Sequence, residues 1–112
     1  MEKPQIVYDE FAKIDIRIGR IVAARRFERA RHPSYKVEVD FGPLGKRSSS
    51  AQITSYSEAE LMGKLVVCVV NMPPRNIAGF RSEVLILGAK NGRSEVVLLS
   101  PLGEIALGEP VF

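Results

Sequence analysis

Hydrophobic and polar residues alternate along several stretches of the chain, which is the pattern of β-strands with one buried face. The clearest stretch is 35–41, where apolar side chains occupy every odd-numbered position and charged side chains occupy the positions between. Further strands are predicted over 46–53, 65–70, 83–89 and 95–99. The run at 65–70 is apolar throughout, as expected of a strand buried on both faces. The chain is therefore predicted to be rich in β-structure.

A long first strand is predicted over 14–27, and its alternation changes phase. Apolar positions are even-numbered as far as Ile18 and odd-numbered from Ile21 onward, so the pattern slips at Gly19. A strand can keep two such halves facing one core only if it bulges or bends between them. We therefore expect a bulge or bend at Gly19, as in strands that turn a corner of a small barrel.

Two short helices interrupt the strand pattern. Apolar residues three or four apart between Val7 and Ile14 predict a short amphipathic helix that depends on packing. In the segment SYSEAELMG, Ser57 and Glu60 have the spacing of a capping box, and Gly63 is placed to end the helix.

The order of these elements predicts an all-β fold, β-rich with short helices. Turns are expected at 42–45 and at Asn91-Gly92, which favours a hairpin. Three strands, a helix and further strands are typical of the OB-fold, a five-stranded Greek-key barrel, here with an added N-terminal helix and C-terminal strands. We expect one such domain over 1–112. A small β-sandwich is the alternative.

Composition places the chain among ordinary globular proteins. Of its 112 residues, 46% are hydrophobic and 26% are charged. No apolar run is long enough to cross a bilayer, and the N-terminus lacks the pattern of a signal peptide. We therefore expect no membrane insertion and a cytoplasmic location. The single cysteine, Cys68, is expected to be a small buried apolar residue.

Positive charge is concentrated in one part of the chain. Residues 17–47 contain nine basic and three acidic residues, whereas the whole chain has a net charge of +3. This asymmetry is consistent with a positive face for phosphate, an anionic membrane surface or an acidic protein. A solvated charged surface with no partner would give the same pattern.

Residue patterns for catalysis are missing. His32 has no second histidine or cysteine at metal-ligand spacing. The serines at 48–50 lack the glycine flanks of a nucleophile elbow, and Gly19, Gly42 and Gly45 match no phosphate-binding loop. Asp15 and Asp40 are more simply explained as partners of basic residues on neighbouring strands. We therefore predict a binding protein without enzymatic activity, metal or cofactor.

The segment NMPPRN, residues 71–76, is a polar interruption between two apolar runs, and we call it the elbow. Pro73 and Pro74 cannot donate ladder hydrogen bonds and stiffen the chain, so Arg75 and Asn76 would be displayed at low conformational cost. The elbow is therefore predicted to present ligand-binding groups at the barrel mouth. A connection whose prolines only end a strand is the alternative.

Five segments together resemble the CsaA family. They are DIRIGRIV (15–22), KVEVDFG (36–42), SSAQIT (49–54), VVNMPPRNIAGFRSEVLILG (69–88) and VVLLSP (96–101). The resemblance runs in order from about Phe11 to the C-terminus with almost no gaps. CsaA proteins are part of a wider tRNA-binding-domain group that includes appendages of methionyl- and phenylalanyl-tRNA synthetases.

The resemblance implies a function. It implies a homodimer of OB-fold subunits that acts as a chaperone, binding unfolded preproteins and assisting Sec-dependent export, with the Sec export ATPase as a further partner. Apolar contacts near Phe80 and Met72 would hold extended segments, with Arg75 and Lys36 at the rim. The alternative is a structure-selective tRNA-binding module acting in trans, which the positive segment and the barrel layout favour.

The resemblance also indicates where ligands bind. In the wider group, a lysine of the second strand and a serine after the elbow contact tRNA, and these correspond to Lys36 and Ser82. Asn71 and Arg75 of the elbow also match. The expected ligand-binding residues, for tRNA or peptide, are Lys36, Ser50, Gln52, Asn71, Arg75, Asn76, Phe80, Ser82 and Glu83.

One departure from the RNA-binding relatives concerns the residues after that serine. The relatives have any residue, then glycine and methionine, where this chain has Glu83, Val84 and Leu85. A carboxylate there would repel phosphate. Stacking candidates are also few, namely Phe80 and Tyr56. Both features favour the chaperone branch.

Overall fold

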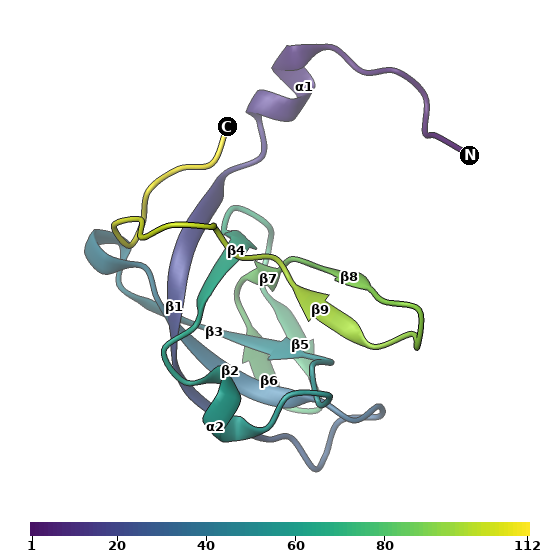
Figure 1. Cartoon of the computed structure of the whole chain (residues 1–112), viewed down its shortest axis with the longest axis vertical. Helices are drawn as coiled ribbons and strands as arrows, with labels where there is room; N and C mark the ends of the chain where they lie inside the picture. The colour runs from purple at the N-terminus through teal and green to yellow at the C-terminus, as the bar shows by residue number, and fades with distance from the viewer.

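The computed structural model of the protein describes all 112 residues (Figure 1). Its elements in chain order are α1 (Tyr8–Ala12), β1 (Ile16–Arg26), β2 (Tyr35–Asp40), a 3₁₀ turn (Gly42–Leu44), β3 (Lys46–Ala51), α2 (Glu58–Leu61), β4 (Leu65–Val69), β5 (Arg75–Ile77), β6 (Phe80–Ser82), β7 (Leu85–Ile86), β8 (Gly88–Lys90) and β9 (Val96–Leu98). None of its helices has the length and apolar character needed to span a membrane.

Five strands form an antiparallel sheet in the order β3-β2-β1-β4-β7. The sheet curls until its two edges meet, because the backbone N–H groups of Glu83 and Val84 donate to the carbonyl of Ser48 in β3, at 2.8 and 3.3 Å. With α2 between β3 and β4, this nearly closed barrel confirms the predicted OB-fold. The sandwich alternative is wrong, because one continuous sheet encloses the core.

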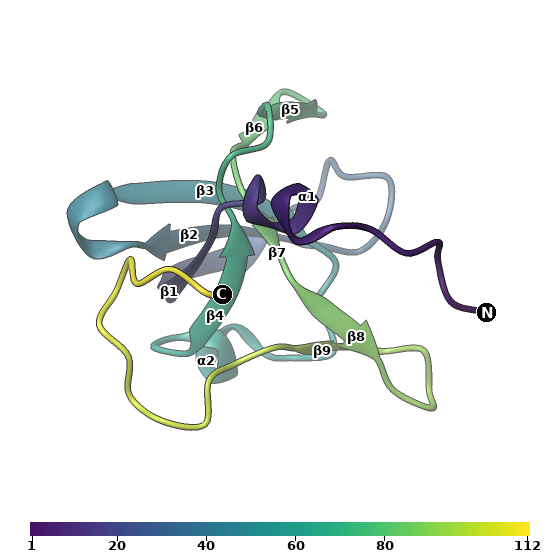
Figure 2. The same cartoon turned by 90° about the horizontal axis from the view of Figure 1, so that it is seen from above.

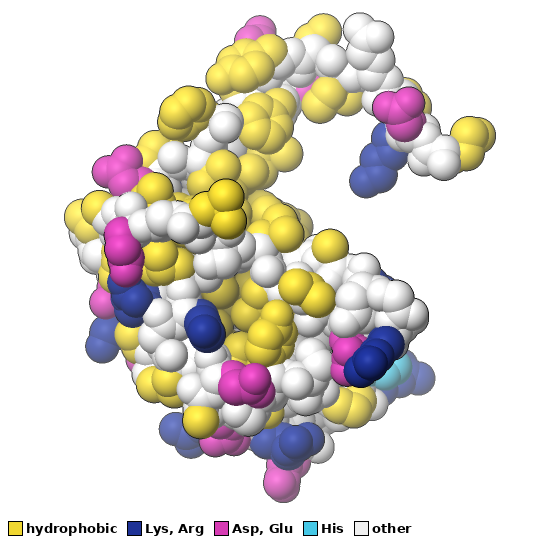
Figure 3. Space-filling model, in the orientation of Figure 1, with side chains coloured by type: hydrophobic (Ala, Val, Ile, Leu, Met, Phe, Trp, Pro, Cys, Tyr) yellow, Lys and Arg dark blue, Asp and Glu magenta, His cyan; other side chains and the backbone are white.

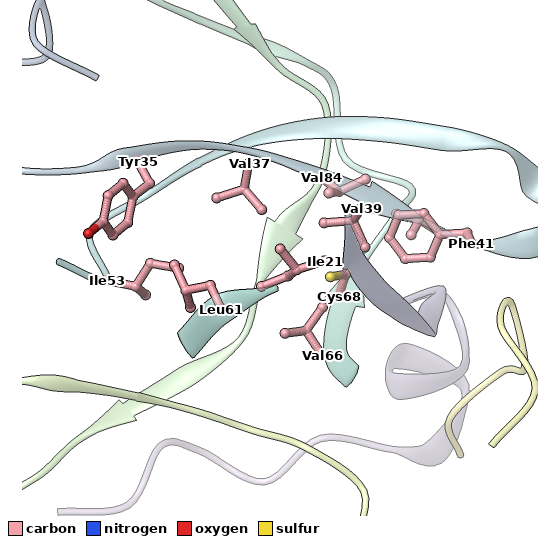
Figure 4. Close-up of a cluster of buried hydrophobic side chains, with 11 residues drawn as sticks. Ile21, Tyr35, Val37, Val39, Phe41, Ile53, Leu61, Val66, Cys68 and Val84 are labelled. Atoms are coloured by element: carbon pink, nitrogen blue, oxygen red, sulfur yellow. The ribbon is translucent and has the colours of Figure 1, made fainter. Parts of the chain in front are cut away.

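The core lies inside this barrel and is filled from all sides (Figure 4). Side chains of β1, β2, β4 and α2 point toward one another there, with Ile21, Val39, Leu61 and Val66 fully buried. Burying a side chain of this size contributes about 1.5–3 kcal/mol. The odd-numbered residues of 35–41 are all buried, as their alternation predicted.

The bulge in β1 is not at Gly19, as we expected, but at Val22, where the register against β2 shifts between Ile21 and Ala23. Gly19 pairs regularly with Val66 of β4. The two apolar halves of the strand therefore do not share one face. Gly19 and Ile21 point into the barrel, whereas the side chains of Ile16 and Ile18 point outward.

The C-terminal tail covers that outward apolar face of β1, which explains why the phase of the strand could change. Ile18 donates to the carbonyl of Glu109 and accepts from the N–H of Gly108, and Val111 donates to Ile16. Ile18 is consequently only 4% exposed although it lies outside the barrel. The sequence pattern gave no sign of this second buried face, because the tail lacks regular alternation.

Both predicted helices are present. Ser57 caps α2 through its side chain, which accepts from the N–H of Glu60 at 3.1 Å, and the Glu60 carboxylate accepts from the N–H of Ser57 at 2.7 Å. This hydrogen bond lowers the pKa of Glu60. In contrast, α1 extends away from the barrel, and its apolar neighbours Val7 and Ile14 are exposed (Figure 1).

The last third of the chain differs most from the prediction. The strand expected over 83–89 is divided into β7 and β8, and the hairpin at Asn91-Gly92 is present with a longer loop, closed by Asn91 N–H donating to the carbonyl of Glu95. A second hairpin, β5–β6, was not predicted. The β5–β6 and β8–β9 hairpins project from the barrel in different directions (Figure 2).

Candidate functional site

The elbow runs into β5, and the chain then turns back on itself to form the β5–β6 hairpin. Arg75 pairs with Ser82 and Ile77 pairs with Phe80, so these four side chains share one face of the hairpin. The two residues between them, Ala78 and Gly79, have φ of 49° and 86°. Positive φ at both positions is the geometry of a type I′ turn, which matches the twist of a two-stranded hairpin.

Side chains attach the hairpin to β3. The Ser50 N–H donates to Ser82 Oγ at 3.0 Å, the Ser48 N–H donates to Glu83 Oε1 at 2.9 Å, and the Ser49 hydroxyl donates to the Val84 carbonyl at 2.8 Å. We call this junction, formed by Ser48–Ser50 and Ser82–Val84, the serine seam. The hydrogen bond from Ser48 N–H lowers the pKa of Glu83, so its carboxylate is held ionised at the seam.

The elbow itself is exposed. Met72, Pro73, Pro74 and Arg75 are all accessible, and the guanidinium of Arg75 has no hydrogen bond or ion pair. Between the elbow and the hairpin is a cavity of about 60 Å³, which we call the elbow pocket. Its walls include Met72, Ile77 and Leu85, and its rim includes Ser50, Arg75 and Ser82.

The hydroxyls at this rim are available to a ligand. Ser82 Oγ is used only as an acceptor, from the Ser50 N–H, so its own hydrogen has no acceptor in the protein. The hydroxyl of Ser50 has no partner either. The elbow pocket therefore offers apolar walls, two free hydroxyls and one guanidinium within a small volume.

Beside the hairpin, the ring of Phe80 and the outer faces of β1, β2 and β3 form a more open hollow of about 270 Å³, the Lys36 hollow. Lys36 Nζ lies 4.8 Å from the ring centre of Phe27 and 5.3 Å from that of Phe80. The two rings meet edge to face at 5.4 Å. Such contacts stabilise a cation by about 0.5–1 kcal/mol at exposed sites, so they hold the ammonium in place.

Arg25 and Glu38 also line the Lys36 hollow, and three more arginines follow Arg25 in the chain. Arg25, Arg26, Arg29 and Arg31 are exposed, and none of them has an ion pair with a carboxylate. Arg26 instead lies over the ring of Tyr35, at 5.9 Å. These four arginines therefore carry unpaired charge at the surface, whereas Arg17 and Arg20 of the same basic segment pair with Asp15 and Glu104.

The structure brings six of the predicted site residues together around the hairpin: Lys36, Ser50, Arg75, Phe80, Ser82 and Glu83. Gln52 lies elsewhere, in a polar groove beside Thr54 and Lys90. Asn76 accepts from the N–H of Gly79 at 2.9 Å and so belongs to the hairpin turn.

Asn71 has an internal role. Its side chain accepts from the Asp15 N–H at 2.9 Å and donates to the Lys13 carbonyl at 2.7 Å. These two bonds tie the end of β4 to the chain between α1 and β1. Asn71 is therefore satisfied within the protein, whereas Arg75 is not.

Sequence reasoning missed three contributors to the site. Phe27 was assigned to the core, but its buried ring contacts Phe80 and Lys36 beside the outer face. Ser48 and Arg25 line the Lys36 hollow. Ser48 could have been found, because it lies two residues from Ser50 in one strand and so faces the same side, whereas the pairing of Arg25 with Lys36 depends on the bulge in β1.

The arrangement is suited to binding. No group of three or more histidine, cysteine, aspartate or glutamate side chains lies close enough together to hold a metal ion. Burial raises the pKa of Cys68 to about 12, so its thiol stays protonated in the core. The groups that face solvent are cations, hydroxyls, aromatic rings and aliphatic walls, which recognise ligands by contact and charge.

Comparison with known proteins identifies similar chains. Residues 16–110 match the family model "Putative tRNA binding domain". The chaperone CsaA from Picrophilus torridus is 46% identical with a TM-score of 0.91, covering 96% of this chain and 100% of that one. The chaperone CsaA from Bacillus anthracis is 43% identical with a TM-score of 0.92, covering 97% of this chain and 100% of that one.

Longer proteins match as well. The methionine–tRNA ligase of Methanosarcina acetivorans is 37% identical over 109 residues, which is 96% of this chain and 15% of the ligase. The chain therefore spans about one seventh of the length of such curated relatives, in contrast to its full coverage of the CsaA chains.

Proposed function

The chain belongs to the tRNA-binding-domain family, in the branch that contains CsaA, and from this premise we propose that it is a chaperone that binds unfolded preproteins. It acts by binding and release, without catalysing a reaction. The link to Sec-dependent export, to the Sec export ATPase and to the cytoplasm rests on the CsaA resemblance.

The elbow pocket is the observation that supports this proposal most directly. Its aliphatic walls accept one apolar side chain of an extended segment, while the free hydroxyls of Ser50 and Ser82 are placed to hydrogen-bond the backbone of that segment. Apolar burial with backbone hydrogen bonds gives affinity without a strict sequence code, as a chaperone requires.

Suppression of aggregation tests the proposal. We expect the protein, at one subunit per client, to slow the light scattering of a chemically denatured client protein. Met72→Asp should abolish this effect, because it places a charge in the pocket wall. Met62→Asp is the matched control, since Met62 at the end of α2 is also 49% exposed. Equal suppression by both variants would place the client site elsewhere, and no suppression by the wild type would remove the chaperone proposal.

We further propose that two subunits form the functional unit. Val7, Tyr8, Ile14 and Phe112 are exposed, and α1 with the C-terminal tail borders an apolar groove of about 310 Å³. Figure 3 shows hydrophobic side chains gathered on α1 and in the hollow beneath it. Contiguous apolar surface of this kind marks protein interfaces, and a twofold pair is the commonest way to cover it.

Light scattering in solution tests the dimer. The measured mass should be twice the 12.4 kDa of one subunit. A Val7→Glu, Ile14→Glu double variant should halve that mass without changing the far-ultraviolet circular dichroism, because neither side chain is in the core. A wild-type mass of one subunit would contradict the proposal.

A specific observation favours tRNA binding as a second function. Lys36 and the unpaired arginines around it form a basic surface with an aromatic floor, which is suited to phosphates and bases. Binding of this type should weaken by roughly 0.7–0.9 log units per phosphate contact for each log unit of salt. Lys36→Ala should weaken tRNA binding and Lys90→Ala, in the β8–β9 hairpin, should not. A flat salt response would remove this candidate.

A further inference from the structure

The elbow pocket is lined by one guanidinium, that of Arg75, and one carboxylate, that of Glu83. We infer that the pocket selects client segments in which an aliphatic side chain lies next to a carboxylate, and that it disfavours segments whose apolar residue is flanked by basic side chains. This inference deepens the proposed chaperone function and rests on it.

The two guanidiniums near the elbow differ in their partners. Arg75, at the rim, is exposed and has no partner. Arg47, in contrast, reaches the carbonyl of Val70, directly before the elbow, at 3.4 Å, and its charge acts on the carboxylate of Glu83. Arg75 is therefore the one cation that lines this small cavity, and it has no internal counter-ion, so a carboxylate on the ligand would supply the missing charge.

Glu83 is the one acidic residue lining the pocket. Its Oε1 accepts from the Ser48 N–H at 2.9 Å and lies 3.0 Å from the Ser48 hydroxyl, while its Oε2 lies 3.9 Å from Arg81 Nε. The carboxylate is therefore engaged by the serine seam and by Arg81. It leaves Arg75 unneutralised and is not free to bind a basic client.

The elbow pocket is small, and much of its lining is apolar. About 60 Å³ is less than half the volume of an apolar cavity of about 150 Å³ that holds benzene. This space fits the end of an aliphatic side chain and is too small for an indole or phenol ring. Because the walls are Met72, Ile77 and Leu85, the occupant must be apolar, and the carboxylate must come from a neighbouring position at the rim.

Positive charge is also present outside the elbow pocket. The exposed arginines of residues 25–31 and Lys36 outnumber the exposed Glu28 and Glu38, so a net positive charge extends beyond the hairpin. A surface of one sign raises the association rate of oppositely charged chains and lowers that of like-charged ones. The apolar walls commit the pocket to polypeptide, since a phosphate has no group to place against them.

Fluorescence anisotropy with three labelled, unstructured peptides tests the inference. The peptides share the same central leucines and differ only in flanking residues, which are glutamate, glutamine or lysine. At physiological ionic strength we expect the glutamate peptide to bind about tenfold more tightly than the lysine peptide, with the glutamine peptide between them. Arg75→Ala should reduce this ratio several-fold, and Arg75→Glu should reduce it further.

Arg93→Ala is the matched control, because Arg93 is an exposed arginine without an ion pair in the loop between β8 and β9. It removes the same net charge and should leave the ratio unchanged. An equal loss in the Arg93 variant would show that overall charge, and not the pocket, determines the preference, and would overturn the inference.

Other outcomes separate this inference from the proposed function. Equal affinity for all three peptides, in a protein that still suppresses aggregation, would overturn the charge selection and leave the chaperone proposal intact. Failure of both assays would remove both proposals. Inorganic phosphate at matched ionic strength could also displace the glutamate peptide while the glutamine peptide does not bind. That result would identify a bare anion site and would overturn the inferred selection of an aliphatic side chain next to a carboxylate.

Discussion

The barrel is held together differently at two of its junctions. Between β1 and β4, five consecutive residue pairs from Ile16↔Val69 to Arg20↔Leu65 form a regular backbone ladder. Between β3 and the chain after the elbow, side chains of serine and glutamate carry much of the contact. The first junction has the core directly behind it, whereas the second holds a projecting hairpin at the surface.

We infer from this difference that the β1–β4 junction mainly determines stability and that the serine seam mainly determines the geometry of the binding site. Backbone hydrogen bonds depend little on side-chain identity, so the strands of the β1–β4 junction can carry the apolar side chains of the core. The serine seam fixes the position of Arg75, Ile77, Phe80 and Ser82 through a few specific groups. We therefore expect changes at the first junction to act on folding and changes at the second to act mainly on the site.

The largest effect is expected at the β1–β4 junction, for Gly19→Ala. A Cβ at this position would clash with Val39 Cγ1 and lie 2.8 Å from Phe41 Cε1, both in the packed core. Overpacking of this kind costs about 1–3 kcal/mol. Urea unfolding should show the loss, and Gly92→Ala is the control, because a Cβ there meets nothing within 4 Å. Equal stability of the two variants would contradict the packing described for β1.

A smaller loss is expected at the serine seam, for Glu83→Ala. The Ser48 N–H would lose its acceptor, and breaking one such bond costs roughly 1–2 kcal/mol. Glu83→Gln keeps an acceptor oxygen and should recover most of the loss. If Glu83→Ala unfolded at the same urea concentration as the wild type, the seam would contribute nothing to stability.

The pH dependence of stability sharpens this prediction. The pKa of Glu83 is lowered in the folded protein by the hydrogen bond from Ser48, so the folded state binds this proton less readily than the unfolded state does. The stabilisation from the ionised Glu83 carboxylate is therefore complete above the ordinary glutamate pKa of about 4.3. It is lost as the pH falls below that value. Below that pH, Glu83→Gln should lose stability less steeply than the wild type. If the stability of the wild type and of Glu83→Gln fell equally steeply with pH, the assignment of this pH dependence to Glu83 would be wrong.

The smallest change in global stability is expected for Ser82→Ala. Ser50 N–H would lose its acceptor at a half-buried position, which costs about 1 kcal/mol or less. Hydrogen exchange should nevertheless quicken at the amide of Ser50, while the amides of β4 that pair with β1 keep their protection. Faster exchange across both junctions would show that they are not independent.

The sequence predicts β2 and α2 best. Alternation in 35–41 and the capping box at Ser57 and Glu60 are local signals, and both elements formed as expected. The bulge was misplaced because the outer face of β1 is covered by the C-terminal tail, a contact over about ninety residues that no local pattern encodes.

The site was only partly predictable for a similar reason. The elbow prolines and Arg75 were recognisable, since proline has a fixed backbone effect at any position. The β5–β6 hairpin was missed because its turn uses Ala78 at positive φ, where Asn or Gly is the usual signal. Glu83 was expected to face a ligand, but its carboxylate accepts hydrogen bonds from Ser48, which only the meeting of two distant segments could reveal.

The most direct test of the account is to map client contact onto the two junctions by nuclear magnetic resonance. Titrating the glutamate-flanked peptide into isotope-labelled protein should shift the amide signals of Ser50, Ile77, Ser82 and Leu85 and leave those of β1 opposite β4 in place. Saturable shifts confined to α1, to the β8–β9 hairpin or to the β1–β4 junction, with the elbow pocket unchanged, would contradict it.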